Sequence, residues 1–176
     1  LDVKRHEQGR RAFERRPRVG DVRVERLMAL PEGSVGRAFG EFLIRYGLDP
    51  AALPVREAND DATWLNAHLY ETHDLWHVVT GFETDVAGEL GLQAFYAAQL
   101  TGKLPVALLT VGFLNTFLYA FGDRARRFDA IVRGWTLGKA MKPLAGFDWA
   151  QAMERPLAEV KEELGYVPQA RALLAA

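Results

Sequence analysis

One stretch of the sequence limits the fold more than any other: residues 104–122, LPVALLTVGFLNTFLYAFG, carry no charge. A run of this length reaches the lower limit for a helix that crosses a bilayer. However, it opens with Pro105, which is tolerated in the first turn of a helix, and it contains Asn115 and two threonines. These features favour a buried central helix in a helical domain, and a membrane span is the alternative.

Elsewhere, apolar residues recur at the three- and four-residue spacing of helices, and no period-two alternation is long enough to predict a sheet. Ser34, Asn59 and Asp60 are candidate helix caps. The predicted helices cover residues 35–46, 60–80, 84–101, 104–121, 123–141 and a segment from Asp148 that Pro156 ends or kinks. The sequence therefore predicts an all-α, single-domain helical bundle of about five to seven helices, formed by residues 27–176.

The composition narrows the chemistry. A chain of 176 residues fits one domain and is long enough to bury a core. It has no cysteine, which excludes disulfides and thiolate metal sites, so any metal must bind nitrogen and oxygen ligands. The formal net charge of −1 argues against nucleic acid as a partner.

Residues 1–26 form a basic, weakly patterned N-terminal arm. The Lys and Arg residues that crowd its first 18 positions are Lys4, Arg5, Arg10, Arg11, Arg15, Arg16 and Arg18, against the acidic Asp2, Glu7 and Glu14. Such an arm could contact an anionic membrane surface, where each basic residue contributes about 1 kcal/mol, and a solvated arm is the alternative. The N-terminus lacks the apolar stretch of a signal peptide, and the absence of cysteine fits a cytoplasmic protein.

The residues that carry chemistry begin with His73 and His77. They are four apart, so on a helix they stack on one face, about 40° apart around the axis, and their imidazoles can converge on one ion. The spacing is that of the HExxH zinc helix, but Asp74 stands where that motif has Glu. Asn66 and Tyr70 lie on the same polar wedge and are candidates to orient the ligands.

Glu89 is the next candidate ligand. It is the only charged residue between Asp85 and Lys103, in a nearly apolar helix, which predicts a buried carboxylate that needs a cation. Gln93 and Tyr96 share its helix face and could orient it. The alternatives are that the histidines are satisfied core or surface residues and that Glu89 is solvated. His6 is predicted to be solvated, and His68, on a different face from the pair, to be structural.

At these residues the sequence resembles a known family. His73-Asp74-x-x-His77, eleven residues and then Glu89 match the HDxxH-x11-E signature of the coenzyme Q (ubiquinone) biosynthesis protein 4 family. The flanking segments that also resemble the family are residues 75–81, 88–92, 30–39, 147–149, 155–160 and 164–165. The likeness begins near residue 27 and covers nearly the rest of the chain.

The resemblance implies a helical protein of ubiquinone biosynthesis that is peripheral on a membrane. It implies one divalent metal, usually zinc, at His73, Asp74, His77 and Glu89, which would also be the catalytic residues. The implied reaction is decarboxylation with hydroxylation at C1 of a polyprenylated hydroxybenzoate. Iron or manganese would suit the oxygen chemistry, because zinc cannot change redox state.

The same resemblance implies partners and a place in the cell. The implied partners are a polyprenyl lipid or quinone precursor, the membrane surface and other quinone-synthesis proteins, with a homodimer as a further option. The Arg- and Ala-rich composition predicts a bacterial homologue, peripheral on the cytoplasmic membrane, which could also serve another isoprenoid pathway.

Two alternatives stay open at this point. The chain is either a metal-dependent decarboxylase or a non-catalytic isoprenoid-binding scaffold with a structural metal. For the lipid tail, the sequence predicts a groove between the 104–121 helix and the 84–101 helix, lined by Leu114, Phe117 and Leu118. The alternative is that the 104–121 helix is simply the packed centre of the core.

Overall fold

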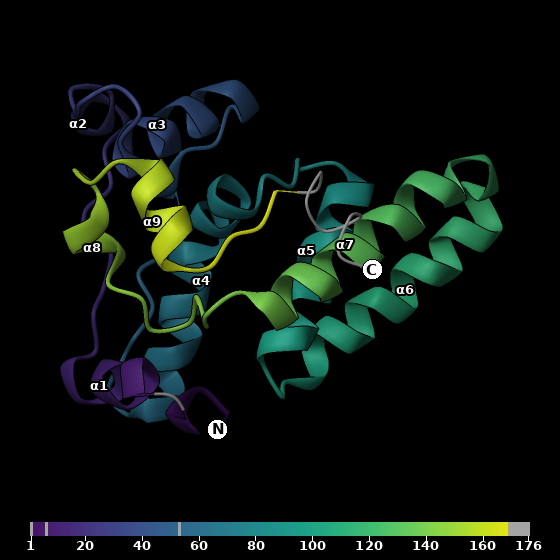
Figure 1. The fold of residues 1–176 in the computed structure, drawn as a ribbon, viewed down its shortest axis with the longest axis horizontal. Coiled ribbons are helices and arrows are strands. Elements are labelled where there is room, and N and C mark those ends of the chain that lie inside the picture. The colour runs from purple at the N-terminus through teal and green to yellow at the C-terminus, as the bar shows by residue number, and fades with distance from the viewer. Residues whose placement is uncertain (1, 6, 53, 169–176) are drawn as a thin grey trace. The chain divides into compact units, whose positions relative to one another are not determined.

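The computed structural model describes residues 2–5, 7–52 and 54–168 (Figure 1), so His6 lies outside the described residues. The described residues contain nine α-helices and no strand, and a single isolated bridge joins Ser34 to Pro156. The α-helices are α1 (Glu7–Arg15), α2 (Val24–Met28), α3 (Val35–Tyr46), α4 (Asp61–Thr80), α5 (Val86–Gln99), α6 (Lys103–Tyr119), α7 (Arg124–Ala140), α8 (Trp149–Ala152) and α9 (Leu157–Glu163). Three 3-10 helices accompany them: η1 (Asp2–Arg5), η2 (Pro50–Ala52) and η3 (Phe121–Asp123). The all-α prediction is confirmed, and the helices beyond the predicted five to seven are short.

The helix ends follow the predicted caps. The Ser34 side chain accepts a hydrogen bond from the Arg37 amide at the start of α3, and Gly47 ends that helix with a φ of 63°. The Thr63 amide donates to Asp60 Oδ1 at 2.7 Å, which caps α4. Pro156 is the N-cap residue of α9, and α8 ends before it at Ala152, so Pro156 precedes a helix instead of ending or kinking one. Polar caps and glycine stops were predictable because they act over a few neighbouring residues.

The chain forms two compact units, and each is described by itself. The α4 unit comprises Val3–Val79 and Pro143–Leu164, and the α5 unit is built on Thr80–Lys142. In the α4 unit, α4 supplies the buried Trp64, Leu75 and Trp76. Its cap and its apolar face thus fix the helix that carries the two histidines.

Part of the basic arm is folded into the α4 unit. Val3, Ala12 and Phe13 are buried, and the Phe13 ring meets the Trp64 ring edge-on at 4.9 Å between centroids. Trp64 Nε1 donates to the Pro17 carbonyl oxygen at 3.2 Å. A wholly solvated arm therefore does not describe these residues, because three apolar side chains within it have partners in the unit.

In the α5 unit, α5 packs against both α6 and α7. A Cβ at Gly134 of α7 would collide with the Gly91 backbone of α5, and a Cβ at Gly138 would approach Phe95 O at 2.9 Å. On the other side, a Cβ at Gly112 of α6 would collide with the Leu90 side chain. Glycines at these contacts let the helix backbones approach closely.

The prediction that the 104–121 helix is a buried central helix is wrong. In α6 only Pro105, Gly112 and Thr116 are buried, whereas Leu114, Phe117 and Leu118 are exposed. These three residues lie one and two helical turns apart, so α6 buries a narrow stripe, in which Gly112 faces Leu90 of α5, and leaves its other faces exposed. Leu114, Phe117 and Leu118 lie outside this buried stripe, and both the predicted groove between α6 and α5 and their lipid-binding role stay predictions.

Among the described residues, every helix taken singly falls short of the length and hydropathy of a bilayer span. One bent pair, Lys103–Tyr119 with Phe121–Ala140 at 117°, meets the length and composition test together.

Candidate metal centre

Helix α4 brings His73 and His77 together, as their spacing predicted. The two Nε2 atoms lie 3.3 Å apart, and the imidazole rings are nearly perpendicular, with centroids 4.9 Å apart. His77 is buried and His73 is half-buried. One turn of α-helix thus aims two ring nitrogens at one point beside the core.

The His77 ring is held from a second helix. Phe42 of α3 stacks on it, with centroids 5.6 Å apart and an interplanar angle of 23°. Phe42 is itself buried, so the stack leaves the imidazole little freedom to rotate. Sequence patterns could not predict this contact, because it joins residues far apart in the chain.

Glu89 supplies a carboxylate from the first turn of α5. Asp85 caps that helix by accepting a hydrogen bond from the Gly88 amide at 2.8 Å, which fixes where the first turn begins. Glu89 is half-buried, so the expectation of a fully buried carboxylate is corrected. Ligand atoms of His73, His77 and Glu89 all lie within 4.8 Å of one another.

The donor set fits a divalent cation. Two nitrogens bound to one tetrahedral zinc at about 2.05 Å lie about 3.3 Å apart, which is the separation of the two Nε2 atoms here. Two neutral imidazoles and one carboxylate are a usual set for zinc, iron or manganese.

The other predicted site residues lie as follows. Asp74 is half-buried on α4 and is not a member of the three-residue group, so its ligand role stays a prediction. Asn66 Oδ1 accepts a hydrogen bond from Arg56 Nη1 at 2.7 Å, and the Arg56 guanidinium lies 3.8 Å above the Tyr70 ring. Sequence reasoning missed Arg56 as the partner of both.

On α5, Gln93 is half-buried and Tyr96 is buried. They follow Glu89 by four and seven residues and thus share its face of the helix. Their proposed part in orienting Glu89 stays a prediction.

His68 has a structural role, as predicted. Its Nε2 accepts a hydrogen bond from the Gly146 amide at 2.9 Å, so its Nδ1 carries the proton, which faces the Pro17 carbonyl oxygen at 3.3 Å. Burial lowers the pKa of His68 to about 4, against the opposing effect of the Pro17 carbonyl. The neutral ring ties two distant segments to α4.

An ion pair close to His73 in the chain was not predicted. Arg18 Nε donates to both Glu71 carboxylate oxygens, at 3.0 and 2.9 Å, and the guanidinium also bonds the Arg56 carbonyl oxygen. The hydrogen bond to Glu71 raises the pKa of Arg18. The pair joins the basic arm to α4 at Glu71, two residues before His73.

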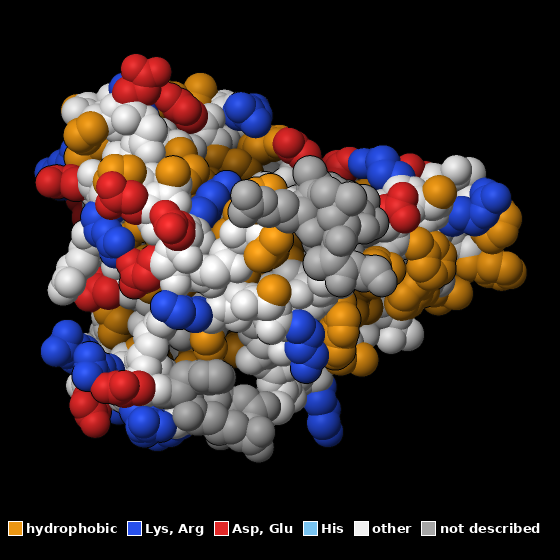
Figure 2. Space-filling model, in the orientation of Figure 1, with side chains coloured by type: hydrophobic (Ala, Val, Ile, Leu, Met, Phe, Trp, Pro, Cys, Tyr) orange, Lys and Arg blue, Asp and Glu red, His pale blue; other side chains and the backbone are white. Residues whose placement is uncertain are grey.

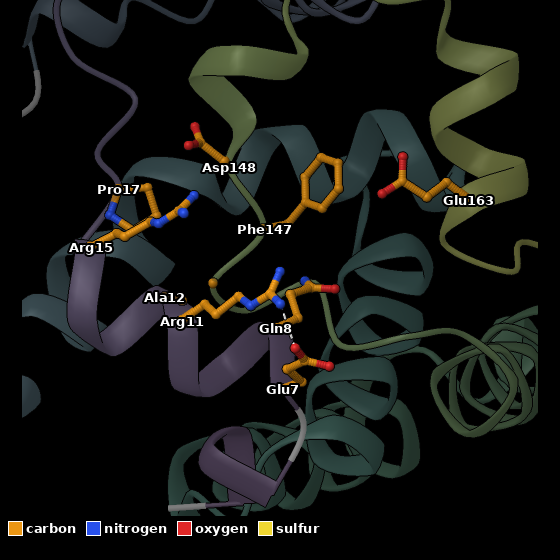
Figure 3. A pocket seen from close by; sticks show the side chains of 10 residues that line it. Glu7, Gln8, Arg11, Ala12, Arg15, Pro17, Phe147, Asp148 and Glu163 are labelled. Atoms are coloured by element: carbon orange, nitrogen blue, oxygen red, sulfur yellow. Dashed lines mark hydrogen bonds and ion pairs between the residues drawn. The ribbon is translucent and has the colours of Figure 1, made fainter.

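The α4 unit also contains an open cavity of about 380 Å³, bordered by α1, the segment around Phe147 and Glu163 of α9 (Figure 3). Its charged lining mixes Arg11 and Arg15 with Glu7, Asp148 and Glu163. None of the predicted site residues lines it, so this cavity and the candidate metal centre involve different residues.

Fold and site together define an all-α protein with a candidate two-histidine, one-carboxylate metal centre. The family model of coenzyme Q (ubiquinone) biosynthesis protein Coq4 matches residues 2–169, and the chain belongs to this family. The match includes the basic arm, which the resemblance found by motif did not cover.

Curated relatives and a solved structure agree with this assignment. The chain is 32% identical to the mitochondrial ubiquinone biosynthesis protein coq4 of Aspergillus fumigatus, over 89% of this chain and 55% of the relative. The corresponding protein of Botryotinia fuckeliana is 31% identical, over 89% and 56%. A crystal structure of a ubiquinone biosynthesis protein from Nostoc punctiforme superposes with a TM-score of 0.82 at 30% identity, over 93% of this chain and 77% of that one. The chain thus spans about half the length of these curated relatives.

Proposed function

We propose that this protein of ubiquinone biosynthesis is a metal-dependent enzyme that removes the C1 carboxyl group of a polyprenylated hydroxybenzoate and hydroxylates that carbon. The observation that carries the proposal is the convergence of His73 Nε2 and His77 Nε2, 3.3 Å apart, with the Glu89 carboxylate within 4.8 Å. Family membership supports a role in ubiquinone biosynthesis, and the three converging side chains support a metal-dependent reaction.

The roles of the residues follow from their atoms. His73 and His77 would hold the ion through Nε2, while Phe42 keeps the His77 ring in place. Glu89 would offset part of the positive charge of the ion. A bound divalent ion would act as a Lewis acid toward a carboxylate or ring oxygen of the substrate. Zinc is implied by the resemblance, and iron or manganese would suit the same donors.

The proposed reaction is a two-electron oxidation. The ring loses CO2 and gains one oxygen atom as a hydroxyl group. With dioxygen as oxidant, the second oxygen atom leaves as water, and two electrons and two protons come from a reductant. The chain would hold and orient the ring, and the oxidant and reductant are co-substrates.

The second candidate is a non-catalytic lipid-binding scaffold with a structural metal. The exposed apolar side chains of α6 favour contact with lipid whether or not the protein is an enzyme. The number of donors favours the enzyme, because structural zinc sites are closed by four protein ligands and the group here has three. If Asp74 also binds the ion, this argument reverses.

We further propose that the protein is bacterial and acts as a peripheral protein at the cytoplasmic membrane, beside other quinone-synthesis proteins. The names of these relatives place those proteins in mitochondria. A lipid substrate that water cannot hold supports a position at the membrane surface. A homodimer is an additional proposal.

The test is turnover of a prenylated 4-hydroxybenzoate with a 13C-labelled carboxyl group under 18O-labelled dioxygen. The enzyme proposal expects labelled CO2 and one 18O atom at C1 of the product, both lost in His73→Ala. The scaffold is favoured instead if metal-loaded wild-type protein, supplied with a reductant, binds the substrate but neither releases labelled CO2 nor adds 18O to the ring.

A further inference from the structure

The outward sides of α6 and α7 carry a broad apolar surface. Figure 2 shows hydrophobic side chains gathered over these two helices. The exposed fraction is 70% for Phe117, 57% for Leu114 and 48% for Trp135. The surface, named the hairpin face below, is represented by Val111, Leu114, Phe117 and Leu118 of α6 and by Val132 and Trp135 of α7. Exposed apolar side chains this numerous and this close together mark an interaction site in soluble proteins.

The hairpin face is continuous and held in place from below. Phe113 of α6 and Phe128 of α7 meet with ring centroids 5.4 Å apart, so the exposed side chains of the two helices adjoin. Beneath them, the buried Arg127 donates to Asn115 Oδ1 at 2.9 Å and to Thr116 Oγ1 at 3.0 Å. These polar groups are satisfied inside the helix pair, which leaves an outer surface that is mainly apolar.

The charged residues of α6 and α7 indicate which kind of partner fits the hairpin face. Residues 103–142 contain seven Lys or Arg and two Asp, whereas the whole chain has a net charge of −1, so the rest of the chain is acidic. Asp123 is bonded by Arg126 and Arg127, which also lowers its pKa to about 2. The Lys139 ammonium lies 5.0 Å from the Trp135 ring centroid, at the far end of α7 from Arg124. An apolar face is thus flanked by cations on its own helices.

We propose that the hairpin face docks on an anionic lipid bilayer, with the apolar side chains inserted shallowly and the cations at the headgroups. This is the surface chemistry of interfacial helices, and Trp and Tyr are enriched at that depth. A second copy of this chain is a poorer partner, because two hairpin faces would bring like charges together. The inference deepens the peripheral placement proposed above and does not depend on the metal.

The protein carries its own reporter for this contact. Of its four tryptophans, Trp64 and Trp76 are 0% exposed and Trp149 is 1% exposed, so only Trp135 is open to solvent. On titration of the full chain with vesicles containing phosphatidylglycerol, Trp135 emission should shift to the blue and be quenched by brominated lipid. Vesicles of phosphatidylcholine alone should bind about tenfold or more weakly, because several cations each contribute about fivefold at an anionic surface.

Variants localise the contact. Phe117→Ser and Leu114→Ser should each weaken partitioning about tenfold, because a buried apolar side chain contributes on that scale. Lys139→Glu should weaken binding to anionic vesicles and leave binding to neutral vesicles unchanged. Val55→Ser is the matched control, since Val55 is 93% exposed and lies in the α4 unit; it should bind as the wild type does.

Three results would overturn the proposal. The first is that Phe117→Ser partitions into vesicles as strongly as the wild type, and the second is that Phe117→Ser and Val55→Ser lose vesicle binding equally. The third is that, without lipid, the blue shift of the emission follows self-association measured by light scattering. Metal content, measured in the same samples, should not change in Phe117→Ser. A protein that binds vesicles but holds no metal would contradict only the metal proposal. A protein that holds metal but does not bind vesicles would contradict only the membrane proposal.

Discussion

At the residue scale, Glu89 tests whether the third donor belongs to the metal centre. Glu89→Ala should weaken metal binding by about 100-fold or more, because even groups behind the ligands contribute 10–100-fold. Glu89→Gln keeps the shape, loses the charge and should also weaken binding. Calorimetric titration of the metal-free protein measures both affinities. Glu83→Gln, an exposed glutamate three residues before the first residue of α5, is the control and should bind metal normally.

Phe42 tests whether stacking positions His77. Phe42→Leu should weaken metal binding about two- to tenfold, the range expected for one aromatic contact of 0.5–1.5 kcal/mol, and Phe42→Tyr should retain wild-type affinity. Phe39→Leu removes a ring that is also buried in α3, so it controls for a general loss of packing. If Phe39→Leu and Phe42→Leu lower metal affinity equally, the stack has no special part in the site.

His68 predicts how stability depends on pH. Its folded-state pKa of about 4 lies below the unfolded value of about 6.5, so the unfolded chain binds the proton more readily. The contribution of His68 is therefore fully present above about pH 6.5 and is lost as pH falls toward 4, by roughly 3 kcal/mol at most. Urea unfolding at several pH values should show this loss, and His68→Gln should flatten the slope. An equal slope in both proteins would contradict the account.

The sequence predicted the site residues whose geometry is local. Four-residue spacing on one helix was sufficient to bring His73 and His77 together, because the α-helix repeats every 3.6 residues. Phe42 and Arg18 could not be found in the same way, since they reach α4 from 35 and 53 residues away in the chain. The buried stripe of α4 was also obscured, because His68 and Thr72 are polar types that point into the core.

At the scale of elements, the close contact between α5 and α7 depends on Gly134. Gly134→Ala should lower the free energy of unfolding by about 1–3 kcal/mol, because the added Cβ collides with the Gly91 backbone. Gly122→Ala is the control, since nothing lies within 4 Å of a Cβ there, and its effect should stay within about 0.5 kcal/mol. Equal unfolding midpoints for the two variants would mean that the helices are not tightly packed at this point.

Helix α6 has a sequence pattern that predicts a helix but does not predict which of its faces is buried. Its existence and its start were predictable from the uncharged run and Pro105, whereas it ends at Tyr119, before the predicted stop at Gly122. Its burial was not, because a helix that is apolar all round has no polar side to indicate which face meets solvent. The structure shows that only the stripe with Gly112 and Thr116 is covered. An apolar run alone therefore does not separate a core helix from one that presents an apolar surface.

At the scale of the whole molecule, family membership and the metal centre rest on independent observations. The family match covers residues 2–169, whereas the chemistry depends on three side chains from α4 and α5. Because the chain covers only about half of its curated relatives, its own metal content is the more direct test of what it does.

That measurement is the divalent metal content of the purified, full chain, by elemental analysis, for wild type, His77→Ala and His68→Gln. The account predicts about one ion per chain in the wild type and in His68→Gln, and none in His77→Ala, because two-point chelation from one helix face is lost. The circular dichroism spectrum of His77→Ala should show that the variant is still helical. If alanine at this position disturbs the core, His77→Asn is the second variant, and it should also lose the metal. Stoichiometric metal in folded His77→Ala would contradict the central claim.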